Sequence, residues 1–177
     1  MNSTALTMLI LASNAAAPAL PRWNPKAPEN TQVLPAFSYA TVEPVLTAVG
    51  ARFTRVGSNA ARPQLNVSFA NGRKAMLVMS ACDPQGSACK ALSLQSYWTR
   101  IANSPPVKTA QAIEDFNRRY SFAKAFVAVD GRPALQRYVT ADYGFIRGNL
   151  AVNLLVFESQ SDQFATQVLR PLETGAR

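Results

Sequence analysis

The segment from Ala81 to Thr140 constrains the fold of this chain more than any other part of the sequence. Its first half contains two cysteines, Cys82 and Cys89, which bracket a short loop between two expected strands. Its second half predicts an amphipathic helix that leads into a tight hairpin with a turn at Asp130-Gly131. Strands and helices in this order predict an α+β domain in which an antiparallel sheet buries one face against helices.

Alternating side chains predict further strands before the cysteine loop. Residues 65–69 alternate between apolar and polar side chains, which is the period of a half-buried strand. Asn71-Gly72 follows, and this dipeptide strongly favours a two-residue turn between antiparallel strands. We therefore expect a return strand over 73–81 and another strand over 90–98, after the cysteine loop.

Three segments have the apolar spacing and the end signals of helices. The first is expected to begin with Thr41 as its N-cap and to end at Gly50. The second is expected over 108–120, with acidic residues early and basic residues late, as the helix dipole favours. The third is expected over about 147–169. The predicted order is therefore α-β-β-β-(β)-α-β-β-α, with one strand optional.

The N-terminus predicts the location of the protein. Residues 1–17 contain a short apolar run followed by small residues, which is typical of a signal peptide. The run is too short to cross a bilayer, which needs about 20 apolar residues. A periplasmic or secreted location follows from this interpretation. A cytoplasmic location is the alternative, because no lysine or arginine precedes the run.

The rest of the chain is expected to form one domain with short flanking segments. Residues 18–40 contain five prolines and are expected to form an extended linker or arm. Trp23 within this arm is expected to pack onto the domain, although an exposed anchor for a partner is the alternative. The domain itself is expected over 41–169, and residues 170–177 are expected to be a tail.

The two cysteines are expected to form a disulfide. Cys82 and Cys89 lie at the two bases of a loop that contains Pro84 and Gly86. Closing this loop of eight residues would stabilise the fold by about 2.5 kcal/mol. The bond would require an oxidising compartment, and a pair of inert buried thiols is the alternative.

Composition and motifs argue against the common catalytic and metal sites. The sequence has no histidine, so it lacks the commonest general base and a usual metal ligand. Two thiolates alone cannot complete a zinc site. The sequence also lacks a glycine-rich phosphate loop, a Gly-x-Ser-x-Gly elbow and any metal-ligand spacing. We therefore expect neither an enzyme nor a bound cofactor.

The net charge of +8 comes from basic residues that are scattered along the chain. A charge of this size affects solubility and non-specific adhesion before it indicates a particular partner. We therefore do not expect specific nucleic-acid binding. Electrostatic docking of the domain on an anionic surface or polymer, such as lipid or nucleic acid, is kept as the alternative function.

Four residues are candidates for a binding surface. Tyr97 and Trp98, at the end of an expected strand, could stack on a peptide or a base. Arg118 and Arg119, at the end of an expected helix, could hold a carboxylate or a phosphate through paired hydrogen bonds. The alternative roles are ordinary packing for the aromatic rings and ordinary solvation for the two arginines.

The residues of several segments resemble the YbjN family, which is sometimes described as a family of bacterial sensory transduction regulators. The similar segments are Cys82-Asp83, Lys90 to Trp98, Ile113 to Ala125, Asp130-Gly131 and Tyr143-Gly144. Phe116-Asn117-Arg118 is the most specific part, although the family usually has tryptophan where Phe116 stands.

This resemblance implies a fold and a loose functional label. The YbjN family resembles type III secretion chaperones in fold, and no catalytic residues are implied. Phe116, Asn117, Asp130 and Gly131 are expected to be structural residues of the family motif. We therefore predict a non-enzymatic exported domain that binds another protein in a chaperone-like or regulatory role. Exposed sheet edges would also permit a homodimer.

Overall fold

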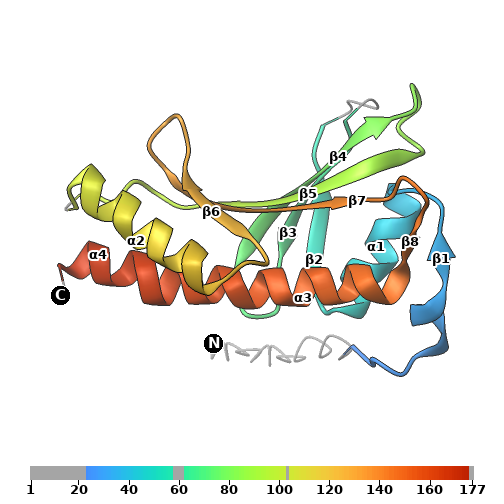
Figure 1. The fold of residues 1–177 in the computed structure, drawn as a ribbon. Coiled ribbons are helices and arrows are strands. Elements are labelled where there is room, and N and C mark those ends of the chain that lie inside the picture. The colour runs from blue at the N-terminus through green and yellow to red at the C-terminus, as the bar shows by residue number, and fades with distance from the viewer. Residues whose placement is uncertain (1–22, 58–61, 103, 176–177) are drawn as a thin grey trace, which may run out of the picture.

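The computed structural model describes residues 23–57, 62–102 and 104–175 (Figure 1). The signal peptide predicted over 1–17 lies outside these residues, as do residues 18–22 of the predicted linker. No helix among the described residues combines the length and the apolar character needed to cross a membrane.

An antiparallel sheet of six strands forms the middle of the domain, in the order β2-β3-β4-β5-β7-β6. The strands are β2 (Arg52–Arg55), β3 (Gln64–Ser68), β4 (Lys74–Cys82), β5 (Cys89–Tyr97), β6 (Lys124–Val127) and β7 (Pro133–Thr140). The predicted α+β class is confirmed. Four strands lie between the first two helices, and β2 precedes the three that were predicted there from side-chain patterns. Both predicted hairpins are present, with Gly72 and Gly131 at positive φ angles of 82° and 79° in their turns.

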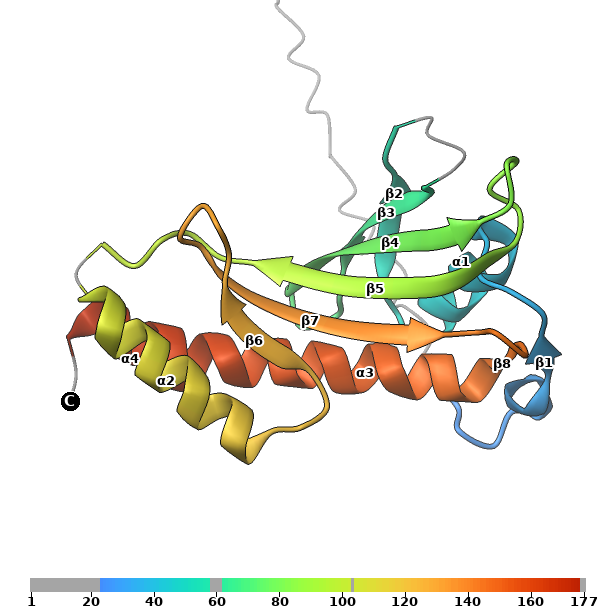
Figure 2. The ribbon, with the colours of Figure 1, turned by 45° about the horizontal axis from the view of Figure 1, so that its top comes forward.

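Helices cover one face of this sheet (Figures 1 and 2). They are α1 (Tyr39–Ala48), α2 (Pro106–Arg119) and α3 (Arg147–Phe164). The α3 helix continues through a π-helical turn, Ala165–Leu169, into α4 (Arg170–Thr174). The first residues of the expected C-terminal tail are therefore helical.

The predicted N-cap of the first helix is wrong. The N-cap is Ser38, and Thr41 occupies the third position inside α1. The Thr41 backbone N–H donates to the Ser38 hydroxyl at 3.2 Å, while the Ser38 N–H donates to the Thr41 hydroxyl at 2.8 Å. This reciprocal capping box satisfies two backbone donors at once, so the helix begins earlier than a lone Thr41 cap indicates.

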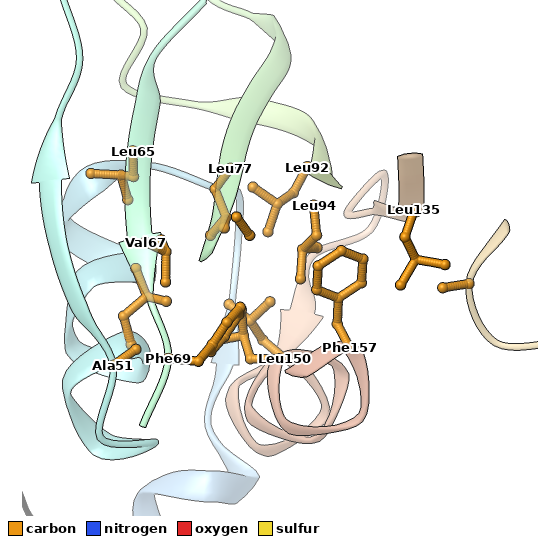
Figure 3. Packing of buried hydrophobic residues seen from close by; sticks show 14 of the residues in the cluster. Ala51, Leu65, Val67, Phe69, Leu77, Leu92, Leu94, Leu135, Leu150 and Phe157 are labelled. Atoms are coloured by element: carbon orange, nitrogen blue, oxygen red, sulfur yellow. The ribbon is translucent and has the colours of Figure 1, made fainter. Parts of the chain in front are cut away.

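The core lies between the helices and the sheet (Figure 3). Leu65, Leu77 and Leu94 lie directly opposite one another on neighbouring strands, and all three are fully buried. Leu150 and Phe157 of α3 meet them from the helix side (Figure 3). The alternation that predicted the strands therefore also selects the side chains that face the helices.

The described part of the expected linker packs onto the domain. A 3₁₀ turn, η1 (Pro28–Thr31), precedes strand β1 (Val33–Leu34), which pairs with β8 (Phe145–Ile146) just before α3. Phe37 is fully buried and stacks on Phe145 with ring centroids 4.6 Å apart. Trp23 also packs against the core, as expected. Residues 23–38 are thus an integral part of the fold.

The disulfide between Cys82 and Cys89 is present and closes the loop between β4 and β5. The two cysteines lie directly opposite each other in the β4–β5 ladder, so strand pairing itself brings the sulfurs together. Within the loop, the Asp83 carboxylate accepts hydrogen bonds from the Ser87 hydroxyl and from the backbone N–H groups of Ser87 and Ala88. These bonds, led by the one from the Ser87 hydroxyl, lower the pKa of Asp83.

Candidate functional site

The helices leave one face of the sheet open, the upper side in Figure 1. This open face contains a groove of about 780 Å³. Neighbouring strands from β2 to β5 supply most of its lining, and Arg132 contributes from the β6–β7 turn. Side chains that point away from the core form its surface: Arg52, Thr54, Asn66, Ser68, Lys74, Met76, Gln95 and Tyr97.

The strand register arranges these side chains in two rows across the sheet. Directly paired residues of an antiparallel ladder share a face. Arg52 pairs with Ser68 and Ser68 pairs with Lys74, so a hydroxyl lies between two cations. The second row runs from Thr54 through Asn66 and Met76 to Gln95. The groove therefore has a charged row beside a row that is mostly uncharged and polar.

A hydrogen-bond network holds the uncharged side chains of β5 and β7 in place. The side-chain amides of Gln95 and Gln136 both donate to the Ser93 hydroxyl, at 2.9 Å and 2.8 Å. The Tyr97 hydroxyl donates to the Gln95 side-chain oxygen at 3.2 Å. This network restrains Gln95 and Tyr97 at the groove, where hydroxyl and amide groups can donate to and accept from a polar ligand.

All charged residues in the six strands are basic. All ten acidic residues of the chain are among the described residues, and none of them lies in the six strands. On the open face the strands carry Arg52, Lys74 and Lys124. Arg52 and Lys74 are exposed, and neither has an ion-pair partner among the described residues. The groove is thus a positively charged surface with two available cations.

Arg132 at the groove is paired with a carboxylate of its own turn. Asp130, in the β6–β7 turn, binds Arg132 at 2.7 Å and also accepts the Arg132 backbone N–H. These contacts, the backbone bond first, lower the pKa of Asp130. The Arg132 guanidinium also lies over the Tyr97 ring, 4.9 Å from its centroid. Arg132 therefore serves as a structured wall of the groove.

The structure separates the two predicted aromatic residues. Tyr97 lines the groove, with 39% of its surface exposed. Trp98 lies on the helix side, where its ring meets Phe164 with centroids 5.1 Å apart. Consecutive residues near the end of a strand point to opposite faces, so the pair does not form one aromatic surface.

The two predicted arginines lie on the exposed side of α2 and have local partners. Arg118 binds Glu114 at 2.6 Å and Asp115 at 3.4 Å, and its hydrogen bond to Glu114 raises its pKa. The Arg119 guanidinium donates to the Asp115 backbone carbonyl at 3.3 Å. Of the four predicted binding residues, only Tyr97 lines the groove.

The residues of the family motif have structural positions. The Asn117 side chain accepts the Ala125 N–H at 2.8 Å and donates to the Ala125 carbonyl at 2.9 Å. These two bonds attach α2 to the edge strand β6 and cover backbone groups that would otherwise be free to pair with another chain. Phe116 is fully buried between Phe164 and Tyr120. Gly131 permits the hairpin turn, where a Cβ would lie 2.8 Å from the Arg100 Nε.

The sequence patterns did not predict the groove itself. Asn66, Ser68 and Gln95 alternate with apolar residues within the predicted strands, a pattern that places them on the face away from the core. Their convergence with Arg52 and Lys74 depends on the strand order and on which face the helices leave open. A signal was present in the sequence, since the predicted strands contain basic residues and no acidic residue.

No metal centre is formed by the described residues, among which no three His, Cys, Asp or Glu side chains cluster. The structure instead defines an α+β domain with helices on one sheet face and a positively charged groove on the other. The YbjN family model, described as "Putative bacterial sensory transduction regulator", matches residues 38–170. The chain therefore belongs to the YbjN family. A comparison with curated proteins finds no match.

Proposed function

We propose that this protein is a non-enzymatic regulator that acts by binding another protein in the groove on the open face of its sheet. The groove is the observation that carries the proposal, because it presents charged, polar and apolar side chains on a face that the described helices do not cover. The description of the YbjN family as regulators of sensory transduction supports a regulatory role.

The chemistry of the groove favours binding over catalysis. Its lining contains no imidazole or carboxylate, which are the commonest general bases, and no thiol. The available groups are hydroxyls, amides and cations, together with the Met76 side chain. These groups can hold and orient a ligand through hydrogen bonds and charge.

We also propose that the domain works in an oxidising compartment, the periplasm or the extracellular space. The Cys82–Cys89 disulfide supports this location, because disulfides persist where thiols are not kept reduced. The apolar run within residues 1–17 adds support from the sequence.

Site-specific photo-crosslinking in the native host tests the proposed binding site. A photoreactive phenylalanine analogue at Met76 is expected to capture one protein, whereas the same analogue at Gln111, on the exposed side of α2, is not. Ser68→Trp fills the groove without changing the charge, and tryptophan is well tolerated in strands. Capture from Met76 should therefore disappear in the Ser68→Trp background. Equal capture from Met76 and Gln111, or capture that survives Ser68→Trp, would contradict the proposal.

A further inference from the structure

We infer that the groove binds an acidic, extended segment of the partner protein, with its carboxylates held by Arg52 and Lys74. This inference rests on the proposed function and adds the chemical class of the segment that is recognised.

The charged row provides the site for the carboxylates. Arg52 and Lys74 lie on either side of Ser68, two strand spacings apart, which is about 9.5 Å. Both side chains are long and exposed, so both can approach an anion placed over the Ser68 hydroxyl. An arginine can bind a carboxylate through two parallel hydrogen bonds, and a lysine adds a second positive charge.

The absence of counter-charge in the strands makes an anionic ligand favourable. Arg52 and Lys74 have no ion-pair partner among the described residues, whereas Arg55, Arg73, Arg118 and Arg132 each have at least one. Two neighbouring cations without a counter-ion raise the local positive potential, which an anion lowers when it binds. Four arginines of the described structure are therefore neutralised by carboxylates, whereas the two cations Arg52 and Lys74 at the groove are not.

The uncharged row suits the main chain of a peptide. Thr54, Asn66 and Gln95 offer hydroxyl and amide groups, which can both donate to and accept from peptide N–H and C=O groups. From β2 to β5 the groove spans three strand spacings, or about 14 Å, which is the length of about four extended residues. Met76 between the polar side chains provides an apolar contact for a ligand side chain.

The same residues are poorly suited to nucleic acid. Binding of single strands combines a long positively charged path with aromatic rings on which bases stack. Here two cations are available, and Tyr97, the exposed ring at the groove, is already covered on one side by Arg132. A short acidic peptide matches both the number of charges and the polar groups between them.

Selection from a display library of random twelve-residue peptides tests the inference on the full chain. Peptides that bind the wild-type protein are expected to be enriched in Asp and Glu. Their affinity, measured by fluorescence anisotropy with the selected peptides, should fall by about tenfold or more in Arg52→Glu/Lys74→Glu. The matched control is Lys26→Glu/Lys108→Glu, which makes the same change in net charge at two exposed lysines outside the groove and should bind as the wild type does.

The outcomes separate this inference from the proposed function. Selected peptides that are neutral, whose binding is lost in Ser68→Trp and unchanged in Arg52→Glu/Lys74→Glu, would overturn the inference of an acidic segment. The groove would remain the binding site. Failure to select any peptide that Ser68→Trp blocks would overturn both. A fluorescein-labelled DNA strand of twenty nucleotides is the polyanion control. If it bound more tightly than any selected peptide, and if this binding were lost in Arg52→Glu/Lys74→Glu, the ligand would be a polyanion and the acidic-peptide inference would be overturned. Circular dichroism and urea midpoints check that each variant is folded.

Discussion

Replacing Asn117 by alanine is expected to destabilise the domain by about 1.5 kcal/mol. The wild-type side chain makes two hydrogen bonds to the Ala125 backbone, at 2.8 Å and 2.9 Å. Each such bond contributes about 1 kcal/mol net, so losing both costs about 2 kcal/mol. The higher helix propensity of alanine in α2 offsets about 0.5 kcal/mol of this loss.

Urea unfolding followed by circular dichroism measures this effect. With a denaturant slope of about 2 kcal/mol per molar urea, the midpoint should fall by about 0.75 M. Asn117→Asp keeps an acceptor for the Ala125 N–H but places a carboxylate oxygen against the Ala125 carbonyl. At neutral pH it should therefore be at least as destabilising as Asn117→Ala.

Gln111→Ala provides the control on the same helix. Gln111 is exposed, and its amide donates to Asp115 at a distance of 3.3 Å, so its loss should change stability by less than about 0.5 kcal/mol. The reasoning would be refuted if Asn117→Ala unfolded at the same urea concentration as the wild type, or if Asn117→Asp were as stable as the wild type. Either result would mean that the two bonds to β6 do not hold α2 in place.

Three other predictions follow from the loop and the core. The free energy of unfolding of Cys82→Ser/Cys89→Ser should be about 2.5 kcal/mol lower than that of the wild type. A reductant should lower the free energy of unfolding of the wild type and leave that of the variant unchanged. Insensitivity of both proteins to the reductant would contradict this prediction. Phe157→Ala removes a fully buried ring and should cost about 3–5 kcal/mol in the same assay; a loss below about 1 kcal/mol would place Phe157 outside the core. The pKa of Asp83 is lower in the folded state, so its ionised form stabilises the fold above about pH 4, and that contribution is lost as the pH falls through the lowered pKa. Asp83→Asn should therefore reduce the slope of the melting temperature against pH in this acidic range. An unchanged slope would contradict a stabilising role of the ionised Asp83 side chain and its bond to Ser87.

The local elements of this fold could be predicted from sequence because each has a local physical cause. The Asn71-Gly72 and Asp130-Gly131 turns need positive φ angles that glycine adopts without strain. The spacing of Ile113 and Phe116 along α2 creates an apolar side, and both residues are buried. The first residue of α1 does not follow from residue type alone, because Ser38 and Thr41 are both suitable caps and their mutual hydrogen bonds select Ser38.

Long-range packing decided the surroundings of the two predicted aromatic residues, whereas the partners of Arg118 are local. Tyr97 and Trp98 are neighbours in sequence, yet one lines the groove and the other contacts Phe164. Arg118 was expected to be exposed, and the Glu114 and Asp115 side chains that bind it lie one turn earlier in the same helix. That local pairing could have been read from the spacing, since residues three and four apart on a helix are neighbours.

The sequence by itself determined the class of fold, the two hairpins, the facing cysteines and the absence of acidic residues from the strands. These features depend on residue type and on contacts between residues that are close in the chain. Only the tertiary structure decided that β2 lies beside β3 at one edge of the sheet, and that Arg52 and Lys74 flank Ser68 on the open face. The groove depends on strand order and on the face that the helices cover, and these are settled by packing between distant segments.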